Sequence, residues 1–558
     1  MSKPWYSSYE SGVPHEIDVT SYSSIVEILE EGFAKYSTLP SFHCMGKSYT
    51  YREMDLLSKK FASYLQNDLK LQKGDRVALM MPNILQYPVA LFGVLRAGLI
   101  AVNVNPLYTA RELEHQLKDS GSKAIVIFEN SAHILEQVLS KTPVKHVITT
   151  QIGDFLSFPK SLLVNFVIKK VKKMVPNWSI SSAVSFKDVV FGADESQYKK
   201  PTLSLNDTAF LQYTGGTTGV SKGADLTHGN IVANMVQARA WIKNLIKDGQ
   251  EIIITPLPLY HIFSLTANCF IFSSVGALNV LITNPRDMPG FIKELKKWKF
   301  TAFTGVNTLF NGLLNNEEFA SVDFSHLKVS LGGGMAVQRA VAERWKKVTG
   351  CPLIEAYGLT ETSPAACINP MTLKDYNGTI GIPLSSTDVV IKDDDGKNVA
   401  TGETGEICIK GPQVMRGYWN RPDETAQVMT DDGFFRTGDI GVMDEKGYFK
   451  IVDRKKDMIL VSGFNVYPNE VEDVVVTHPK VFEAAAIGVP DDKSGEAVKV
   501  FVVKKDESLT VEELKAFCKE GLTGYKCPKH YEFRTELPKS NVGKILRKEL
   551  RDPPAAQA

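Results

Sequence analysis

One stretch constrains the fold of this chain more than any other: residues 211–223, which read LQYTGGTTGVSKG. The preceding residues, 208–213, are apolar enough to form a buried strand. Glycines let the backbone approach a ligand closely, and consecutive free N–H groups in such a loop suit anions. Because α/β folds place ligands at strand ends, the stretch predicts a polyphosphate-binding loop. The alternative is a flexible linker, but linkers rarely follow a buried strand directly.

This loop differs from the common phosphate loop of nucleotide hydrolases. That loop reads GxxxxGK[ST], whereas here Ser221 precedes Lys222 and Gly223 follows it. The surrounding chain predicts an α/β fold, because short apolar runs alternate with helical stretches. The expected strands near the N-terminus are 76–80, 100–104, 124–128 and 146–150.

The domain organisation is predicted from a change of pattern. Residues 378–452 are β-rich and punctuated by glycine, and the charged run DRKKD follows at 453–457. About a hundred residues with their own smaller α/β pattern come after it. We therefore expect a large N-terminal domain with a small β-rich subdomain over 1–453, a hinge at 454–456, and a smaller α+β C-terminal domain over 457–558.

Charge and cysteine content narrow the class of protein. The formal net charge of +1 argues against nucleic acid as a partner. The seven cysteines are scattered and odd in number, which favours reduced thiols and a cytoplasmic protein over a disulfide framework. The N-terminus shows no secretory signal.

Two segments raise the question of a membrane. Between His261 and Arg286 there is no charged side chain, but polar residues and Gly276 favour a buried helix followed by a buried strand. Residues 158–176 instead predict a basic amphipathic helix, which suits an anionic bilayer surface. A plain solvated surface helix or mobile insertion explains the second segment equally well, and both interpretations stay open.

Several further stretches carry groups suited to a nucleotide. YGLTE at 357–361 combines an aromatic ring, a hydroxyl and a carboxylate suited to Mg²⁺ beside phosphates. Close backbone approach is expected at 330–335, and a carboxylate for ribose hydroxyls at 437–439. PLPLYHIF at 256–263 holds a histidine among apolar residues, and PKSNVGK at 538–544 ends in a lysine. Each is weak alone, since any of these side chains also serves ordinary packing or a charged surface.

Together and in this order, these stretches resemble the adenylate-forming superfamily of acyl-CoA synthetases, nonribosomal-peptide adenylation domains and beetle luciferases. The likeness runs nearly end to end. The segment 432–468 resembles the signature of fatty acyl-CoA synthetases, and 102–117 and 281–290 closely resemble bacterial long-chain fatty-acid–CoA ligases. Members of that group commonly have other residues where Thr362, Ser363, Phe434 and Arg436 stand.

The resemblance implies a reaction in two steps that feeds fatty acid β-oxidation. A fatty carboxylate attacks the α-phosphorus of ATP to give acyl-AMP and pyrophosphate, and coenzyme A then displaces AMP. The co-substrates are ATP and coenzyme A, with Mg²⁺ as cofactor. The alternative is an adenylate-forming ligase for another carboxylic acid, medium-chain or aryl.

The resemblance also assigns roles to residues. Lys544 bridges the fatty carboxylate and the α-phosphate, and His261 lies beside the reacting carboxylate. Glu361 with Thr214 holds Mg²⁺, Tyr357 stacks on adenine, and Thr360 contacts the α-phosphate. Asp439 and Arg454 hold the ribose. The remaining nucleotide-binding residues are Tyr213, Gly215, Gly216, Thr217, Thr218, Gly219, Lys222, Gly333, Gly334 and Gly358.

By the same resemblance, the C-terminal domain is mobile and docks in two orientations. It turns about Lys456, one orientation inserting Lys544 and the other bringing Ser462, Gly463 and Phe464 to a tunnel for coenzyme A. A homodimer and a peripheral location on the inner face of the cytoplasmic membrane agree with the resemblance.

Overall fold

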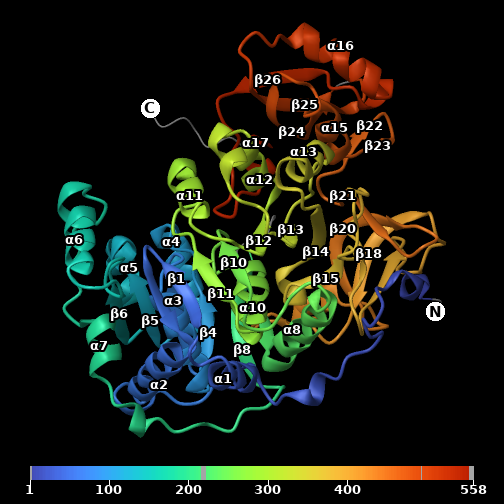
Figure 1. Cartoon of the computed structure of the whole chain (residues 1–558). Coiled ribbons are helices and arrows are strands. Elements are labelled where there is room, and N and C mark those ends of the chain that lie inside the picture. Colours follow the sequence, from blue (N-terminus) through green and yellow to red (C-terminus); the bar gives the residue numbers. More distant parts are fainter. Residues whose placement is uncertain (1–2, 215–220, 492, 552–558) are drawn as a thin grey trace.

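The apolar runs expected from the sequence assemble into two large sheets (Figure 1). The computed structural model describes residues 3–214, 221–491 and 493–551. In these residues one sheet has the order β19 (Gly417–Tyr418), β9 (Lys222–Thr227), β8 (Thr208–Thr214), β4 (Ile100–Asn103), β3 (Arg76–Met80), β5 (Ala124–Phe128), β6 (His146–Thr150) and β7 (Ala183–Ser185). The second runs β16 (Ile382–Pro383), β15 (Ala365–Ile368), β14 (Leu353–Gly358), β13 (Val329–Gly333), β12 (Ala302–Gly305), β10 (Ile252–Thr255), β11 (Leu278–Leu281), β1 (Pro40–Cys44) and β2 (Lys47–Thr50).

The first sheet confirms the strands expected near the N-terminus. Strand β3 pairs in parallel with β4 and β5, and β5 pairs in parallel with β6, as helical crossovers require. The strand expected before the glycine-rich loop is β8. It pairs with β9 in antiparallel register, from Thr208 opposite Thr227 to Thr214 opposite Lys222. The loop therefore connects the ends of two neighbouring strands.

Helices lie between and around these sheets (Figure 1). Every residue of α3 is buried, and its Phe92 ring contacts Phe42 of the second sheet at 6.1 Å between centroids. The α-helices are α1 (Ile25–Lys35), α2 (Tyr51–Asn67), α3 (Gln86–Arg96), α4 (Ala110–Ser120), α5 (Ala132–Val138), α6 (Lys160–Phe166), α7 (Phe186–Gly192), α8 (His228–Ile242), α9 (Ile262–Ser264), α10 (Phe272–Ser274), α11 (Met288–Leu295), α12 (Asn307–Leu314), α13 (Arg339–Thr349), α14 (Pro422–Val428), α15 (Pro468–Val475), α16 (Val511–Gly521) and α17 (Arg547–Arg551).

The uncharged stretch after His261 is buried inside the protein, as expected. It forms α9, the π-helix η7 (Leu265–Ile271) and α10, turns at Gly276, and continues as strand β11. Among the described helices, none has the length and apolar character needed to cross a membrane.

A smaller antiparallel sheet forms the β-rich part expected at 378–452, in the order β17 (Asp388–Lys392), β18 (Thr404–Lys410), β20 (Phe435–Met443) and β21 (Phe449–Arg454). The next strand along the chain belongs to a separate C-terminal sheet, ordered β23 (Phe464–Val466), β22 (Ile459–Val461), β25 (Gly495–Lys504) and β24 (Val481–Asp491), with β26 (His530–Arg534) paired to β25. The chain thus passes between the two sheets within residues 455–458, beside the hinge expected at 454–456.

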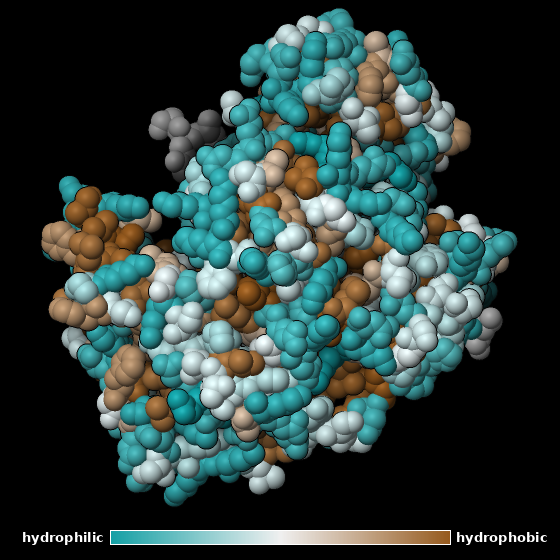
Figure 2. Space-filling view, viewed as in Figure 1, coloured by the Kyte–Doolittle hydropathy of each residue, from teal (hydrophilic) through white to brown (hydrophobic). Residues whose placement is uncertain are grey.

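Helix α6 and its π-helical continuation η5 (Val167–Val171) stand out from the body near the outer strands of the first sheet (Figure 1). Figure 2 shows apolar side chains gathered over this projection. The helix expected over 158–176 therefore exists over 160–171.

Candidate active site

Two hollows meet where the C-terminal part of the chain lies on the N-terminal part. The larger is a cleft of about 2040 Å³ lined by residues of both parts. The smaller is a mostly apolar pocket of about 110 Å³ lined by residues of α8, η7, β12 and β13. Both are lined by His261, Gly334, Ala356, Tyr357, Gly358, Leu359, Thr360 and Lys544. A ligand with a charged end and an apolar end fits such a junction.

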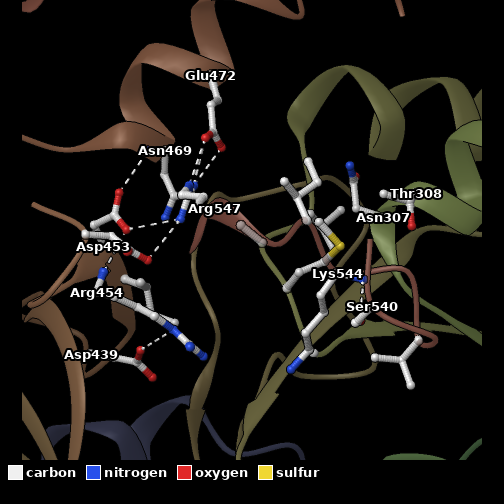
Figure 3. A pocket seen from close by; sticks show the side chains of 18 of the residues that line it. Asn307, Thr308, Asp439, Asp453, Arg454, Asn469, Glu472, Ser540, Lys544 and Arg547 are labelled. Atoms are coloured by element: carbon white, nitrogen blue, oxygen red, sulfur yellow. Dashed lines mark hydrogen bonds and ion pairs between the residues drawn. The ribbon is translucent and has the colours of Figure 1, made fainter. Parts of the chain in front are cut away.

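Lys544 reaches this junction from the C-terminal part. Its turn is closed by a hydrogen bond from Ser540 N to Lys544 O at 2.7 Å, and Thr308 Oγ1 of α12 donates to Gly543 O at 3.0 Å. Gly543 has a φ of +83°, and a Cβ there would lie 2.7 Å from Thr308 Oγ1, so the turn requires glycine. Figure 3 shows the Lys544 side chain extending into the cavity.

The ammonium group of Lys544 lies close to other charges. Burial and the repulsion of Arg454 lower its pKa to about 8, while Asp439 and Glu361 act in the opposite direction. Gly334 lies beside it, since a Cβ there would come within 3.4 Å of Lys544 Cε. An anion that enters the junction therefore favours the protonated form of Lys544, because a nearby negative charge raises the pKa of an ammonium group.

His261 shares the junction but cannot act as a cation at neutral pH. Burial, and then the nearby Lys544, lower its pKa to about 3. Its Nδ1 accepts a hydrogen bond from Phe263 N at 3.4 Å, which holds the ring at the start of α9. A neutral imidazole beside the pocket mouth suits a positioning role.

Asp439 and Arg454 are brought together by adjacent strands. They face each other in the register of β20 and β21, and Arg454 Nε lies 3.3 Å from Asp439 Oδ1 (Figure 3). Tyr357 Oη donates to Asp439 Oδ2 at 2.6 Å, so the tyrosine ring is held at the cleft. Gly333, the last residue of β13, lines the smaller pocket.

Glu361 is a buried carboxylate at the cleft, on the short helix η9 (Thr360–Thr362). Burial raises its pKa, and the hydroxyl of Tyr418, which donates to Oε1 at 2.7 Å, partly offsets this effect. Thr214, at the end of β8, lines the same cleft. No group of three or more metal-binding side chains occurs in the described part of the chain. A carboxylate with a hydroxyl fits Mg²⁺ that arrives with substrate phosphates, because Mg²⁺ commonly takes only one or two protein carboxylates.

Lys222 lines the cleft at the start of β9. It forms an ion pair with Glu424 of α14, and its Nζ lies 5.1 Å from the centre of the Tyr418 ring. Tyr213 also lines the cleft, and its hydroxyl donates to Asp119 Oδ2 at 2.7 Å. The expected loop residues Gly215, Gly216, Thr217, Thr218 and Gly219 lie outside the described residues.

The residue expected at the hinge lines the cleft, whereas the residues expected at the coenzyme A tunnel lie away from it. Lys456 lines the cleft, and burial lowers its pKa to about 8. Ser462, Gly463 and Phe464 lie at the hairpin between β22 and β23, and none of them lines either hollow in the described part. Phe464 is 56% exposed and its ring stacks on Tyr525 at 4.9 Å. This structure holds Lys544 at the junction and these three residues away from it.

Sequence reasoning missed an arginine that joins the two parts. Arg547 Nη2 contacts Glu472 Oε2 at 2.8 Å, and Arg547 Nη1 lies 3.7 Å from Asp453 Oδ1 at the end of β21 (Figure 3). Asp453 Oδ2 also accepts a hydrogen bond from Asn469 N at 2.9 Å. The position of Arg547 three residues after Lys544 was a signal, but its partners are remote in the chain. Tyr418 was also missed, because its hydrogen-bond partner Glu361 is remote from it in the chain.

The four positions at which the chain departs from its resemblance lie outside both hollows. Arg436 Nη1 lies 3.3 Å from Glu406 Oε2, and Phe434 lies beneath Lys392 and Lys410. Neither these residues nor Thr362 and Ser363 are among the described residues that line the hollows.

A polar cleft that meets an apolar pocket at one lysine of the C-terminal domain is typical of enzymes that activate a carboxylic acid as its adenylate. The chain belongs to the AMP-binding enzyme family, which matches residues 29–419, and the C-terminal domain of AMP-binding enzymes matches residues 470–544.

The chain is similar over its whole length to curated relatives. It is 60% identical over 552 residues to a long-chain-fatty-acid–CoA ligase of Yersinia pestis, covering 99% of this chain and 98% of the relative. It is 40% identical to the enzyme of the same name from Bacillus subtilis (strain 168), covering 98% of this chain and 97% of the relative.

Solved structures share the fold. An anthranilate CoA ligase, AuaEII, in complex with anthranoyl-AMP superposes with a TM-score of 0.86 at 24% identity, covering 96% of this chain and 98% of that one. ATP-bound MatB from Rhodopseudomonas palustris has a TM-score of 0.80 at 26% identity, covering 94% and 98%.

Proposed function

We propose that this chain is a long-chain fatty-acid–CoA ligase, which makes acyl-CoA from a fatty acid, ATP and coenzyme A. The observation that carries the proposal is the position of Lys544, where a polar cleft meets an apolar pocket. A fatty acid has its carboxylate at one end of an apolar chain, and ATP is a polyanion. Their reaction requires a cation at the point where the two meet.

In the first step, the carboxylate attacks the α-phosphorus and pyrophosphate leaves. The Lys544 ammonium lies between the two anions and reduces their repulsion, and Thr360 contacts the α-phosphate. Asp439 and Arg454 hold the ribose hydroxyls, and Tyr357 with Gly333 and Gly334 lies along the adenine. These contacts convert an encounter of two anions into an oriented attack.

The β- and γ-phosphates lie along Thr214 and Lys222. Their arrival draws Lys222 from its ion pair with Glu424, because a polyphosphate carries more negative charge than one carboxylate. Glu361 and Thr214 would hold Mg²⁺, which would supply further positive charge to the phosphates.

The second step requires a different arrangement. We place the domain boundary after residue 453 and the hinge at 454–456, so that rotation about Lys456 withdraws Lys544. The hairpin of Ser462, Gly463 and Phe464 then lines the path of coenzyme A, whose thiol displaces AMP from the acyl carbonyl.

The proposal also includes a homodimer and peripheral association with an anionic membrane.

A substrate profile that follows AMP formation tests the proposal. Palmitate and neighbouring long-chain acids are expected to give the highest kcat/KM, with octanoate and benzoate well below them. A preference for benzoate or a medium-chain acid would favour the alternative ligase. Omitting coenzyme A and following pyrophosphate release separates turnover from simple lipid binding.

The Glu361→Gln variant is expected to lose acyl-adenylate formation on the order of 100-fold at limiting Mg²⁺, because an amide is a weaker ligand than a carboxylate. Pyrophosphate release measured across a Mg²⁺ titration checks this. Tyr418→Phe, which removes only the hydrogen bond to Glu361, is the matched control and is expected to change the rate little. An unchanged Mg²⁺ dependence in Glu361→Gln would contradict the assignment.

The pKa of Lys544 predicts an alkaline limb in the first step. Because the ammonium form is the active one and its pKa is about 8, kcat/KM for ATP is expected to be level below pH 8. Above that pH it is expected to fall about tenfold per pH unit. In Lys544→Arg any residual activity is expected to lack this limb, because guanidinium stays protonated. Lys456 has a similar pKa. If the alkaline limb disappears in Lys456→Gln but persists in Lys544→Arg, the limb belongs to Lys456.

A further inference from the structure

Apolar side chains are concentrated on the segment 158–174, called here the α6 projection. Its exposed large hydrophobic residues are Phe158, Leu162, Leu163, Phe166, Val171 and Met174. Phe158 is 81% exposed and Leu163 62% exposed. Figure 2 shows apolar side chains gathered over this projection, which stands out from the body. Single exposed apolar residues are ordinary, whereas a contiguous patch marks an interaction surface.

The projection turns its apolar side away from the protein. Asn165 points inward, where its Oδ1 accepts a hydrogen bond from Gly153 N at 2.7 Å and its Nδ2 donates to Asp154 Oδ1 at 3.1 Å. Ser161 is buried on the same side. A surface helix of a globular protein ordinarily buries its apolar face and exposes its polar face. The orientation here is reversed, so core packing does not account for the apolar residues.

Positive charge surrounds the patch. Lys169 Nζ contacts Glu129 Oε1 of the body at 2.5 Å. Lys170, Lys172 and Lys173 are exposed, and no ion pair is formed by them within the described ranges. Exposed apolar side chains flanked by unpaired lysines complement the interface of a bilayer that contains anionic lipid.

We infer that the α6 projection docks on an anionic phospholipid bilayer, with its apolar side chains at the acyl boundary and Lys170, Lys172 and Lys173 on the headgroups. A second copy of the chain suits the patch less well, because two such surfaces would bring like charges face to face. The inference builds on the proposed function by naming the surface, but it does not depend on catalysis.

Sedimentation with lipid vesicles tests the inference. One set contains phosphatidylcholine alone and the other also contains phosphatidylglycerol. The triple variant Lys170→Gln, Lys172→Gln and Lys173→Gln is expected to lose about 100-fold in partitioning to the anionic vesicles, or about fivefold per lysine. A control triple variant removes the same charge from exposed sites elsewhere, by Lys347→Gln, Lys505→Gln and Lys519→Gln. This control is expected to bind the anionic vesicles about 100-fold more tightly than the first triple variant.

The apolar contribution is tested separately. Leu162→Ser with Phe166→Ser is expected to lower partitioning at least tenfold, whereas Leu56→Ser with Val348→Ser, at exposed sites elsewhere, is not. Turnover of octanoate without vesicles is expected to be unchanged in all four variants, which shows that they fold and separates this test from that of the proposed function. Equal binding by all variants would overturn the inference. So would a change from dimer to monomer in the serine variant with lipid binding unaffected, because the patch would then join two copies of the chain.

Discussion

Replacing Lys544 with alanine is expected to slow acyl-adenylate formation by about 10³- to 10⁵-fold, the effect of a cation supplied to a transferring phosphoryl group. The reason is local: of the described residues of the C-terminal domain, only Lys544 lines both hollows. In the proposed mechanism, removing this charge leaves the repulsion between the carboxylate and the α-phosphate unreduced. ATP–pyrophosphate exchange with palmitate measures this step.

The second half of the reaction provides the comparison. Thioester formation from supplied palmitoyl-AMP and coenzyme A is expected to fall far less in Lys544→Ala, because the proposed domain rotation withdraws Lys544 in that step. Lys505→Ala is the matched control, since Lys505 is exposed, lines neither hollow and forms no ion pair within the described ranges. Equal losses in the two half-reactions would show that Lys544 has been given the wrong role.

Joining the two domains in this orientation is expected to separate the two steps. Asn311 Nδ2 of α12 donates to Phe482 O of the C-terminal sheet at 3.1 Å, so cysteines at these positions lie within reach of a short crosslinker. The crosslinked enzyme is expected to retain acyl-adenylate formation within a few-fold. It is expected to lose thioester formation by about 100-fold or more, because the reacting groups of the second step stay misplaced.

The native cysteines allow a clean version of this experiment. All seven are free, six are buried, and only Cys527 is partly exposed, so a Cys527→Ser background suffices. A cleavable crosslinker provides the control, because cleavage is expected to restore thioester formation in the same sample. If the crosslinked enzyme carried out both half-reactions at full rate, domain rotation would have no place in the mechanism.

Much of the local structure could be predicted from the chain. Strands β3 and β5 have the bounds expected from their apolar runs, because side-chain burial on both faces leaves a nearly continuous apolar signal. Strand β6 also has the expected bounds. The helix over 160–171 was also expected. The partners of Glu361 and Arg547 were not, because Tyr418 and Asp453 are brought to them by sheets whose pairing no short motif encodes.

The sequence by itself determined which chemical groups are present, their order along the chain and the elements that carry them. Hydrophobic periodicity and glycine placement act over a few residues, so they can be read without a structure. Only the tertiary structure decided that Lys544 and His261 share one junction, and that α6 turns its apolar face to solvent. Both depend on how remote segments pack together, which is a property of the whole chain and of no single stretch.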